Sequence, residues 1–255
     1  MEYGGDNGYG WDGHGIHVAG IAAASTNNEA GVAGVDWYAK IHSQRVDNTD
    51  DQGTYNAIVS AVNYSTAVYV LNNSWSLVDE DDGPRYSSTV RMGFTYAYKM
   101  NRVAVVSMGN YYSTYPNQVY YPAGFGQGII AVGATTSSDT RRPTSSIGDH
   151  IDVVAPGTSI LSTYRDGASF SDPNYDYLSG TSMAAPHVSG IVSLLKGYNS
   201  SLYNDDIEHI IQISADDVNS LSYPGWDQYL GYGRVNAKKA LDYLRSPYTI
   251  NHLSA

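Results

Sequence analysis

The chain has 255 residues and a formal net charge of −11, from 14 basic and 25 acidic side chains. This acidic balance argues against a nucleic-acid partner and against an anionic membrane surface, because both attract basic proteins. The absence of cysteine excludes disulfides, thiolate catalysis and zinc sites with cysteine ligands. No apolar run approaches the roughly 18 residues of a membrane span, and we expect no signal peptide because no basic-then-apolar leader opens the chain.

Short apolar runs rich in β-branched residues alternate with segments of helical periodicity. The runs predict strands at residues 40–46, 68–71, 103–106, 129–133 and 151–155. The periodic segments predict helices at residues 52–64, 87–100, 182–198, 204–214 and 236–245. This alternation predicts an α/β fold with a mainly parallel β-sheet that is covered by helices on both faces. Since no repeat or linker interrupts the chain, we expect one domain, with functional groups beyond the carboxyl ends of the strands.

A serine lies at a glycine-flanked turn directly before the longest predicted helix, in Gly-Thr-Ser-Met-Ala-Ala-Pro-His-Val-Ser-Gly at residues 180–190. Gly180 allows a sharp turn, and Pro186 is tolerated in a first helical turn. A hydroxyl at this place lies at the positive end of the helix dipole, and the backbone N–H can donate to an oxyanion. Ser182 is therefore a candidate nucleophile; taken alone, a helix-capping serine explains it equally well.

Two histidines stand three residues apart in Asp-Gly-His-Gly-Ile-His, where a helix is expected to begin. No glutamate completes the zinc-protease pattern His-Glu-x-x-His. His14 is a candidate base that activates a nucleophile, and His17 is expected to be a core histidine hydrogen-bonded to backbone. A metal-dependent hydrolase that uses both histidines is the alternative.

Two further segments follow predicted strands. Asn110 ends the run Val-Val-Ser-Met-Gly-Asn, where its amide can donate to a developing oxyanion or simply form a turn. Residues 74–76, in Asn-Asn-Ser-Trp-Ser, can offer backbone groups to an extended peptide. Both segments place polar groups at strand ends, where sites of α/β sheets form.

Taken together and in this order, the four segments resemble the subtilisin-like serine proteases over about residues 10–244, most specifically at residues 180–190. The resemblance implies a three-layer α/β fold and a secreted, monomeric serine endopeptidase that acts on polypeptides. It implies that Ser182 is the nucleophile that forms an acyl-enzyme and that His14 is the general base. Asn110 and the Ser182 N–H would form the oxyanion hole.

The resemblance also implies where a polypeptide substrate binds. One wall of the primary pocket would come from residues 74–76 and the other from residues 108–110, with a further residue near the pocket bottom. These implied binding residues are Ser74, Trp75, Ser76, Met108, Gly109 and Tyr120. A bulky side chain such as Tyr120 at the bottom would shorten the pocket.

A polar segment at residues 25–32 resembles the calcium loop of the same family. Asn28 would supply a side-chain oxygen to a structural calcium ion, which prefers such ligands. An ordinary polar turn explains the segment equally well. No cofactor is expected for catalysis, and the acidic run at residues 79–82 is expected to be a solvated loop.

The sequence departs from the family at the triad aspartate, which the family carries in Asp-Ser/Thr-Gly after an apolar strand. Asp6 and Asp12 precede His14 but follow no apolar strand, and Ile16 stands where the family has threonine. We therefore expect a domain that is incomplete at its N-terminus, lacking the catalytic-aspartate strand, and a chain that alone is weakly active or inactive. A complete, non-catalytic relative that binds peptides is the alternative.

Overall fold

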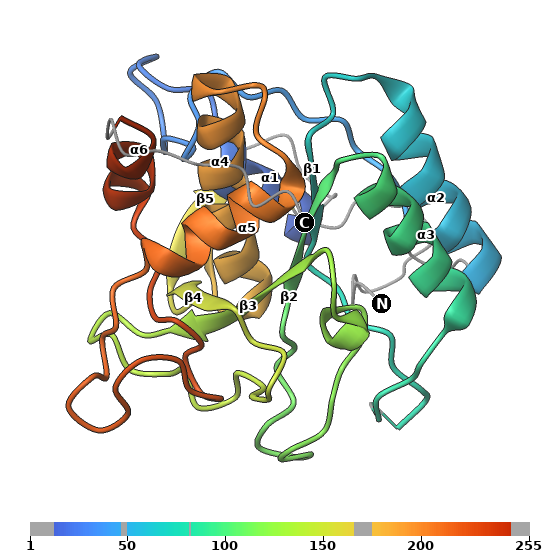
Figure 1. The fold of residues 1–255 in the computed structure, drawn as a ribbon, viewed down its shortest axis with the longest axis vertical. Coiled ribbons are helices and arrows are strands. Elements are labelled where there is room, and N and C mark those ends of the chain that lie inside the picture. Colours follow the sequence, from blue (N-terminus) through green and yellow to red (C-terminus); the bar gives the residue numbers. More distant parts are fainter. Residues whose placement is uncertain (1–12, 47–49, 82, 166–174, 246–255) are drawn as a thin grey trace, which may run out of the picture.

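The computed structural model describes residues 13–46, 50–81, 83–165 and 175–245 (Figure 1). At the centre is a parallel sheet in which the strands follow the order β1-β2-β3-β4. Its strands are β1 (Val70–Asn73), β2 (Val103–Ser107), β3 (Ile129–Thr135) and β4 (Val153–Pro156). An antiparallel pair, β5 (Ile160–Thr163) and β6 (Tyr175–Leu178), lies beside it.

Helices cover the central sheet on both faces, as Figure 1 shows. The helices of the described residues are α1 (Gly13–Ala23), α2 (Asp51–Tyr64), α3 (Ser88–Lys99), α4 (Thr181–Tyr198), α5 (Asn204–Ile213) and α6 (Ala237–Arg245), with a short 3-10 turn at Ala123–Phe125. Successive residues of β2 face opposite layers. Val103 and Val105 pack with α4 and α5, whereas Ala104 and Val106 pack with α2 and α3. The predicted three-layer α/β fold is confirmed.

Local sequence explains where the helices begin. The Asp50 carboxylate accepts the Gly53 N–H at 2.7 Å, and the Ser87 hydroxyl accepts the Val90 N–H at 3.1 Å, so α2 and α3 start at side-chain caps. α4 instead begins after Gly180, without a side-chain cap. Pro186 is the sixth residue of α4, so the expectation that it lies in the first helical turn is wrong, and its missing N–H removes a hydrogen bond from the helix interior.

The predicted strand at residues 40–46 is wrong, because this segment has no regular secondary structure and pairs with no strand among the described residues. A strand depends on a neighbouring strand and on a buried face, and Ile41 here is 55% exposed. The β5–β6 pair was not predicted. Within the described residues, no helix is long and apolar enough to cross a membrane.

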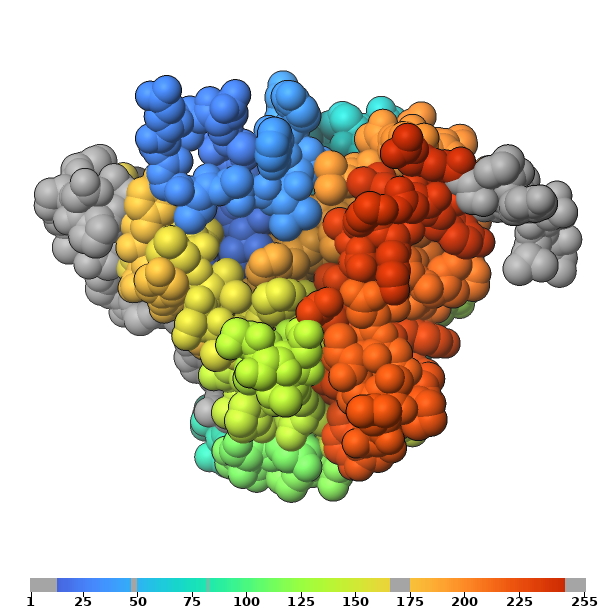
Figure 2. All heavy atoms as spheres, turned by 90° about the vertical axis from the view of Figure 1, so that its left-hand side faces the viewer, coloured from blue at the N-terminus to red at the C-terminus, as the bar shows by residue number. Residues whose placement is uncertain are grey.

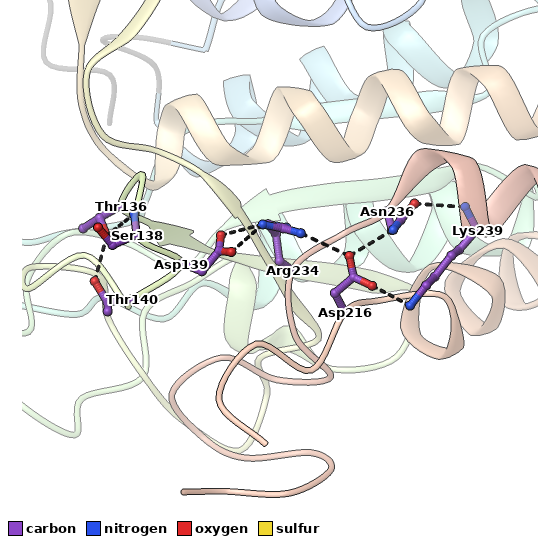
Figure 3. Close-up of polar contacts among 8 residues, drawn as sticks. All are labelled: Thr136, Ser138, Asp139, Thr140, Asp216, Arg234, Asn236 and Lys239. Carbon is purple, nitrogen blue, oxygen red and sulfur yellow. Dashed lines mark hydrogen bonds and ion pairs between the residues drawn. The ribbon is translucent and has the colours of Figure 1, made fainter. Parts of the chain in front are cut away.

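An ionic network ties the turn between β3 and β4 to the C-terminal segment, and the two segments adjoin on the surface (Figures 2 and 3). The Arg234 guanidinium donates to both carboxylate oxygens of Asp139 at 2.6 Å and to Asp216 at 3.2 Å. The hydrogen bond from Lys239, opposed by partial burial but reinforced by Asn236 and Arg234, lowers the pKa of the Asp216 carboxyl. The network thereby anchors the start of α6 to the sheet.

A second acidic group lies where α5 packs on the sheet. The Asp152 carboxylate accepts the Ala131 N–H at 2.7 Å and the Gln212 amide at 2.9 Å. Burial raises the pKa of Asp152 to about 6, although these two hydrogen bonds oppose the shift. Burial, together with the negative charges of Asp152 and Asp205, raises the pKa of Glu208 to about 7. Both carboxyl groups therefore hold protons more tightly in the folded than in the unfolded chain.

This difference gives stability a defined pH dependence. Between about pH 4 and 7 Glu208 is protonated more fully in the folded chain than in the unfolded chain. The free energy of unfolding therefore falls as pH rises through this range. We expect Glu208→Gln to raise the free energy of unfolding by about 1–2 kcal/mol at pH 8, with little effect at pH 4. Chemical denaturation at both pH values measures this, and Glu80→Gln on an exposed loop is the control. Equal effects of Glu208→Gln at both pH values would contradict the electrostatic explanation.

Candidate active site

Segments far apart in the sequence line one pocket of about 340 Å³, beyond the carboxyl ends of β1 and β2. Its lining residues are His14, Ser74, Trp75, Ser76, Ser107, Gly109, Asn110, Tyr111, Tyr164, Leu178, Ser179, Ser182 and Met183. The pocket brings together all three residues that the sequence singled out for chemistry, His14, Asn110 and Ser182. It also collects four of the six implied binding residues and leaves out Met108 and Tyr120.

Ser182 is the second residue of α4 and lies against the segment that follows β1. Its hydroxyl donates to the Ser74 carbonyl at 3.3 Å, and the Ser74 hydroxyl donates to the Ser182 carbonyl at 2.9 Å. Because Gly180 occupies the cap position, the alternative that Ser182 caps the helix is wrong. The hydroxyl instead lies at the positive end of an 18-residue helix, in the lining of the pocket.

Two hydrogen bonds join the Gly109–Asn110 segment to Thr181 at the start of α4. The Asn110 side-chain oxygen accepts the Thr181 N–H at 3.0 Å, and the Thr181 hydroxyl accepts the Gly109 N–H at 3.2 Å. With this oxygen engaged, the amide has its two N–H donors left for other partners. A side chain at Gly180 would place its Cβ 3.1 Å from the Asn110 Nδ2, so glycine gives this amide the room that it occupies.

The two histidines of α1 have different environments. His14 lines the pocket, whereas His17, one turn later, is fully buried. The Nε2 of His17 lies 2.9 Å from the Ile160 carbonyl and 3.1 Å from the Asp176 carbonyl, so it must donate to them. Burial lowers the pKa of His17 despite these two bonds. The prediction of a backbone-bonded core histidine is confirmed, and Nε2 is not available as a metal ligand.

An aromatic stack forms part of the second wall of the pocket. Tyr111 lines the pocket, and its ring stacks on Tyr120 with centroids 4.4 Å apart and an interplanar angle of 17°. Tyr120 is 1% exposed, so it supports the wall from behind instead of forming the pocket surface. Met108 is also fully buried, in the core between the sheet and the α2–α3 layer. The adjacency of Tyr111 to Asn110 was the only sequence signal for its place in the pocket.

Asn28 lies away from this pocket, in a separate hollow of about 300 Å³ lined by residues 26–33. Its side-chain oxygen accepts the Ala30 N–H at 3.3 Å. The described residues contain no group of three or more His, Asp or Glu side chains arranged to hold a metal ion. A cation here would therefore depend on backbone carbonyl and amide oxygens, a donor set that suits calcium.

A serine at a helix N-terminus, a histidine from a second helix and an amide at a strand end around one pocket define a serine-hydrolase type of site. The profile of the subtilase family, Peptidase_S8, matches residues 2–233. The chain belongs to the subtilase family and is thus a serine protease by family.

Similar proteins and one solved structure support this family assignment. Thermitase from Thermoactinomyces vulgaris is 38% identical over 91% of this chain and 76% of its own length, and subtilisin DY from Bacillus licheniformis is 34% identical over 90% and 77%. The chain spans only 52% of a thermophilic serine proteinase from a Bacillus strain. Fervidolysin from Fervidobacterium pennivorans, described as a keratinolytic enzyme related to subtilisin, superposes with a TM-score of 0.78 at 33% identity. That superposition covers 93% of this chain and 36% of fervidolysin.

Proposed function

We propose that this chain is a serine endopeptidase in which Ser182 is the nucleophile and His14 the general base. The convergence of His14, Asn110 and Ser182 on one pocket carries this proposal. The Ser182 hydroxyl turns from the Ser74 carbonyl, transfers its proton to His14 and attacks the peptide carbonyl. The Asn110 amide and the Ser182 N–H donate to the resulting oxyanion. His14 then protonates the leaving amine, and water releases the acyl group by the same steps.

The substrate of this proposal is an extended polypeptide. Its backbone would lie along residues 74–76, and one of its side chains would enter the pocket between that segment and residues 109–111. The chain would act as a secreted monomer, and the loop around Asn28 would hold a calcium ion that supports stability. Removal of calcium by a chelator, with thermal unfolding as the readout, tests that last part.

The stack of Tyr111 on Tyr120 suggests a shallow primary pocket. We expect peptides to be cleaved faster after Ala or Leu than after Phe or Tyr. Tyr111→Gly, which shortens this wall, is expected to improve kcat/KM for Phe substrates relative to Ala substrates by about tenfold. Peptide 4-nitroanilides that differ only at this position measure both effects. A clear preference of the unaltered chain for Phe or Tyr would contradict the shallow pocket.

Covalent labelling tests the proposed function, because it needs only a single attack by the nucleophile. A fluorophosphonate probe should label Ser182, identified by peptide mapping, and should label it faster in a version extended upstream to restore an aspartate before His14. Absence of labelling in that extended version, with the fold verified by circular dichroism, would favour the alternative of a protein that binds peptides without cleaving them. Loss of hydrolysis with chelators and recovery with zinc would instead favour the metal-dependent alternative.

Weak turnover by residues 1–255 stays a prediction. It rests on the absence of an Asp-Ser/Thr-Gly segment before His14 in the printed sequence, and Asp6 and Asp12 lie outside the described residues. If neither aspartate orients His14, Asp6→Asn and Asp12→Asn will leave the labelling rate unchanged. A large loss in either variant would identify the carboxylate that the sequence pattern failed to predict.

A further inference from the structure

A closed chain of polar side chains connects the end of β1 to two points on α4. The Ser189 hydroxyl donates to the Asn72 side-chain oxygen at 2.8 Å, and the Asn72 amide donates to the Ser74 hydroxyl at 3.0 Å. The Ser74 hydroxyl in turn donates to the Ser182 carbonyl at 2.9 Å. Ser182 and Ser189 are seven residues apart, which places them on the same face of the helix. The chain of bonds therefore begins and ends on α4.

Pro186 explains why the Ser182 carbonyl needs this external donor. In an α-helix that carbonyl would accept the N–H of the residue four positions later, but proline has no N–H. The Ser74 hydroxyl supplies the missing hydrogen bond from the end of β1. Ser74 is 8% exposed, and a carbonyl in such surroundings is costly to leave without a donor.

The direction of the Ser74 proton depends on Asn72. A serine hydroxyl has one proton to donate and can also accept. Because the Asn72 amide donates to the Ser74 oxygen, the single Ser74 proton is free to point to the Ser182 carbonyl. Asn72 itself does not line the pocket, so it reaches the reaction only through Ser74 and α4.

We propose that Asn72 is a positioning residue for the nucleophile: it directs the Ser74 proton to the Ser182 carbonyl and, through Ser189, fixes α4 along its axis against β1. This inference rests on the proposed function of Ser182. A shift of α4 along β1 would break the bonds at both ends of the chain. Asn72 thus holds the first turn of the helix, which carries the nucleophile, at one height in the pocket.

Asn72→Asp tests the proposal because it keeps the shape and the acceptor but removes the donor. The carboxylate still accepts from Ser189, and it also attracts the Ser74 proton away from the Ser182 carbonyl. We expect the rate constant of fluorophosphonate labelling and kcat to fall about tenfold, while KM changes by less than about twofold. Ser74→Ala should lower the labelling rate by a similar factor. The double variant should be no slower than the slower single variant, since both changes break one connection.

Asn73→Asp is the matched control. The Asn73 amide donates to the Leu71 and Val105 carbonyls at 2.8 and 3.4 Å, within the sheet. Its loss should lower the thermal unfolding temperature and leave the labelling rate per folded molecule unchanged. If Asn72→Asp does not fold, Ser189→Ala removes the far end of the same chain and should lower the labelling rate about threefold.

The outcomes separate this inference from the proposed function. Absence of labelling in a folded chain extended upstream to restore an aspartate before His14 would refute the role of Ser182 itself. An unaltered chain that labels, with Asn72→Asp or its substitute Ser189→Ala labelling equally fast, would refute only the positioning role. Additive effects of Asn72→Asp and Ser74→Ala on the labelling rate would also refute it. Two substitutions that break the same hydrogen-bond connection should have non-additive effects.

Discussion

Ser182→Ala is expected to abolish fluorophosphonate labelling and to reduce peptide hydrolysis to what binding and the oxyanion hole support without a nucleophile. In subtilisin, a relative of this chain, removal of the triad serine lowers turnover by about 10⁶-fold and removal of the triad aspartate by about 3 × 10⁴-fold, so in a chain without that aspartate we expect a further loss of about 10²-fold. The fold should persist, because the Ser74 hydroxyl bonds to the backbone carbonyl of residue 182, which the substitution keeps. Active-site titration, kcat/KM for a peptide substrate and a thermal unfolding curve measure the three effects.

A second serine of the same pocket provides the control for this prediction. Ser179 lines the pocket, and its hydroxyl accepts the Ser159 N–H at 2.8 Å. Ser179→Ala should label to the same stoichiometry as the unaltered chain, within severalfold of its rate. Persistent labelling of Ser182→Ala, or loss of labelling in Ser179→Ala alone, would assign the nucleophile to another residue.

The central sheet was predictable because its strands are covered on both faces. Residues 103–107 and 129–135 are buried at every position, so they read as continuous apolar runs that leave little choice of structure. Residues 40–46 carry a similar but weaker pattern and form no strand, because strand formation depends on a neighbour that local sequence does not specify. The β5–β6 pair was not predicted because its strands are not buried runs. Leu161 and Tyr177, which pair across it, are both exposed.

The candidate site was predictable where chemistry and spacing coincide in one short segment, as at His14, Asn110 and Ser182. Leu178 reaches the pocket only through tertiary packing, which a single sequence does not reveal, and the only sequence signal for Tyr111 is its position next to Asn110. The sequence shows Pro186 but not its consequence. Pro186 leaves the Ser182 carbonyl without a helical hydrogen bond, and only the structure shows that the Ser74 hydroxyl donates to that carbonyl instead.

Asn110 should contribute to the transition state more than to the fold, and two substitutions can separate these contributions. Asn110→Ala removes both the donor to the oxyanion and the acceptor for the Thr181 N–H. Asn110→Asp keeps the acceptor, removes the donor and places a negative charge beside the oxyanion. We expect kcat to fall about 10²–10³-fold in both variants, the range reported for the corresponding amide in subtilisin, with KM little changed.

Stability should distinguish the two variants where kcat does not. The Thr181 N–H at the start of α4 loses its partner only in Asn110→Ala, so the free energy of unfolding of this variant should be lower by about 1 kcal/mol. Asn110→Asp should retain that stability, because the bond at 3.0 Å persists. Chemical denaturation and kcat, measured on the same preparations, test both parts. Full activity in Asn110→Asp would show that the oxyanion receives its hydrogen bonds elsewhere, and the backbone N–H of Ser182 would then be the principal donor.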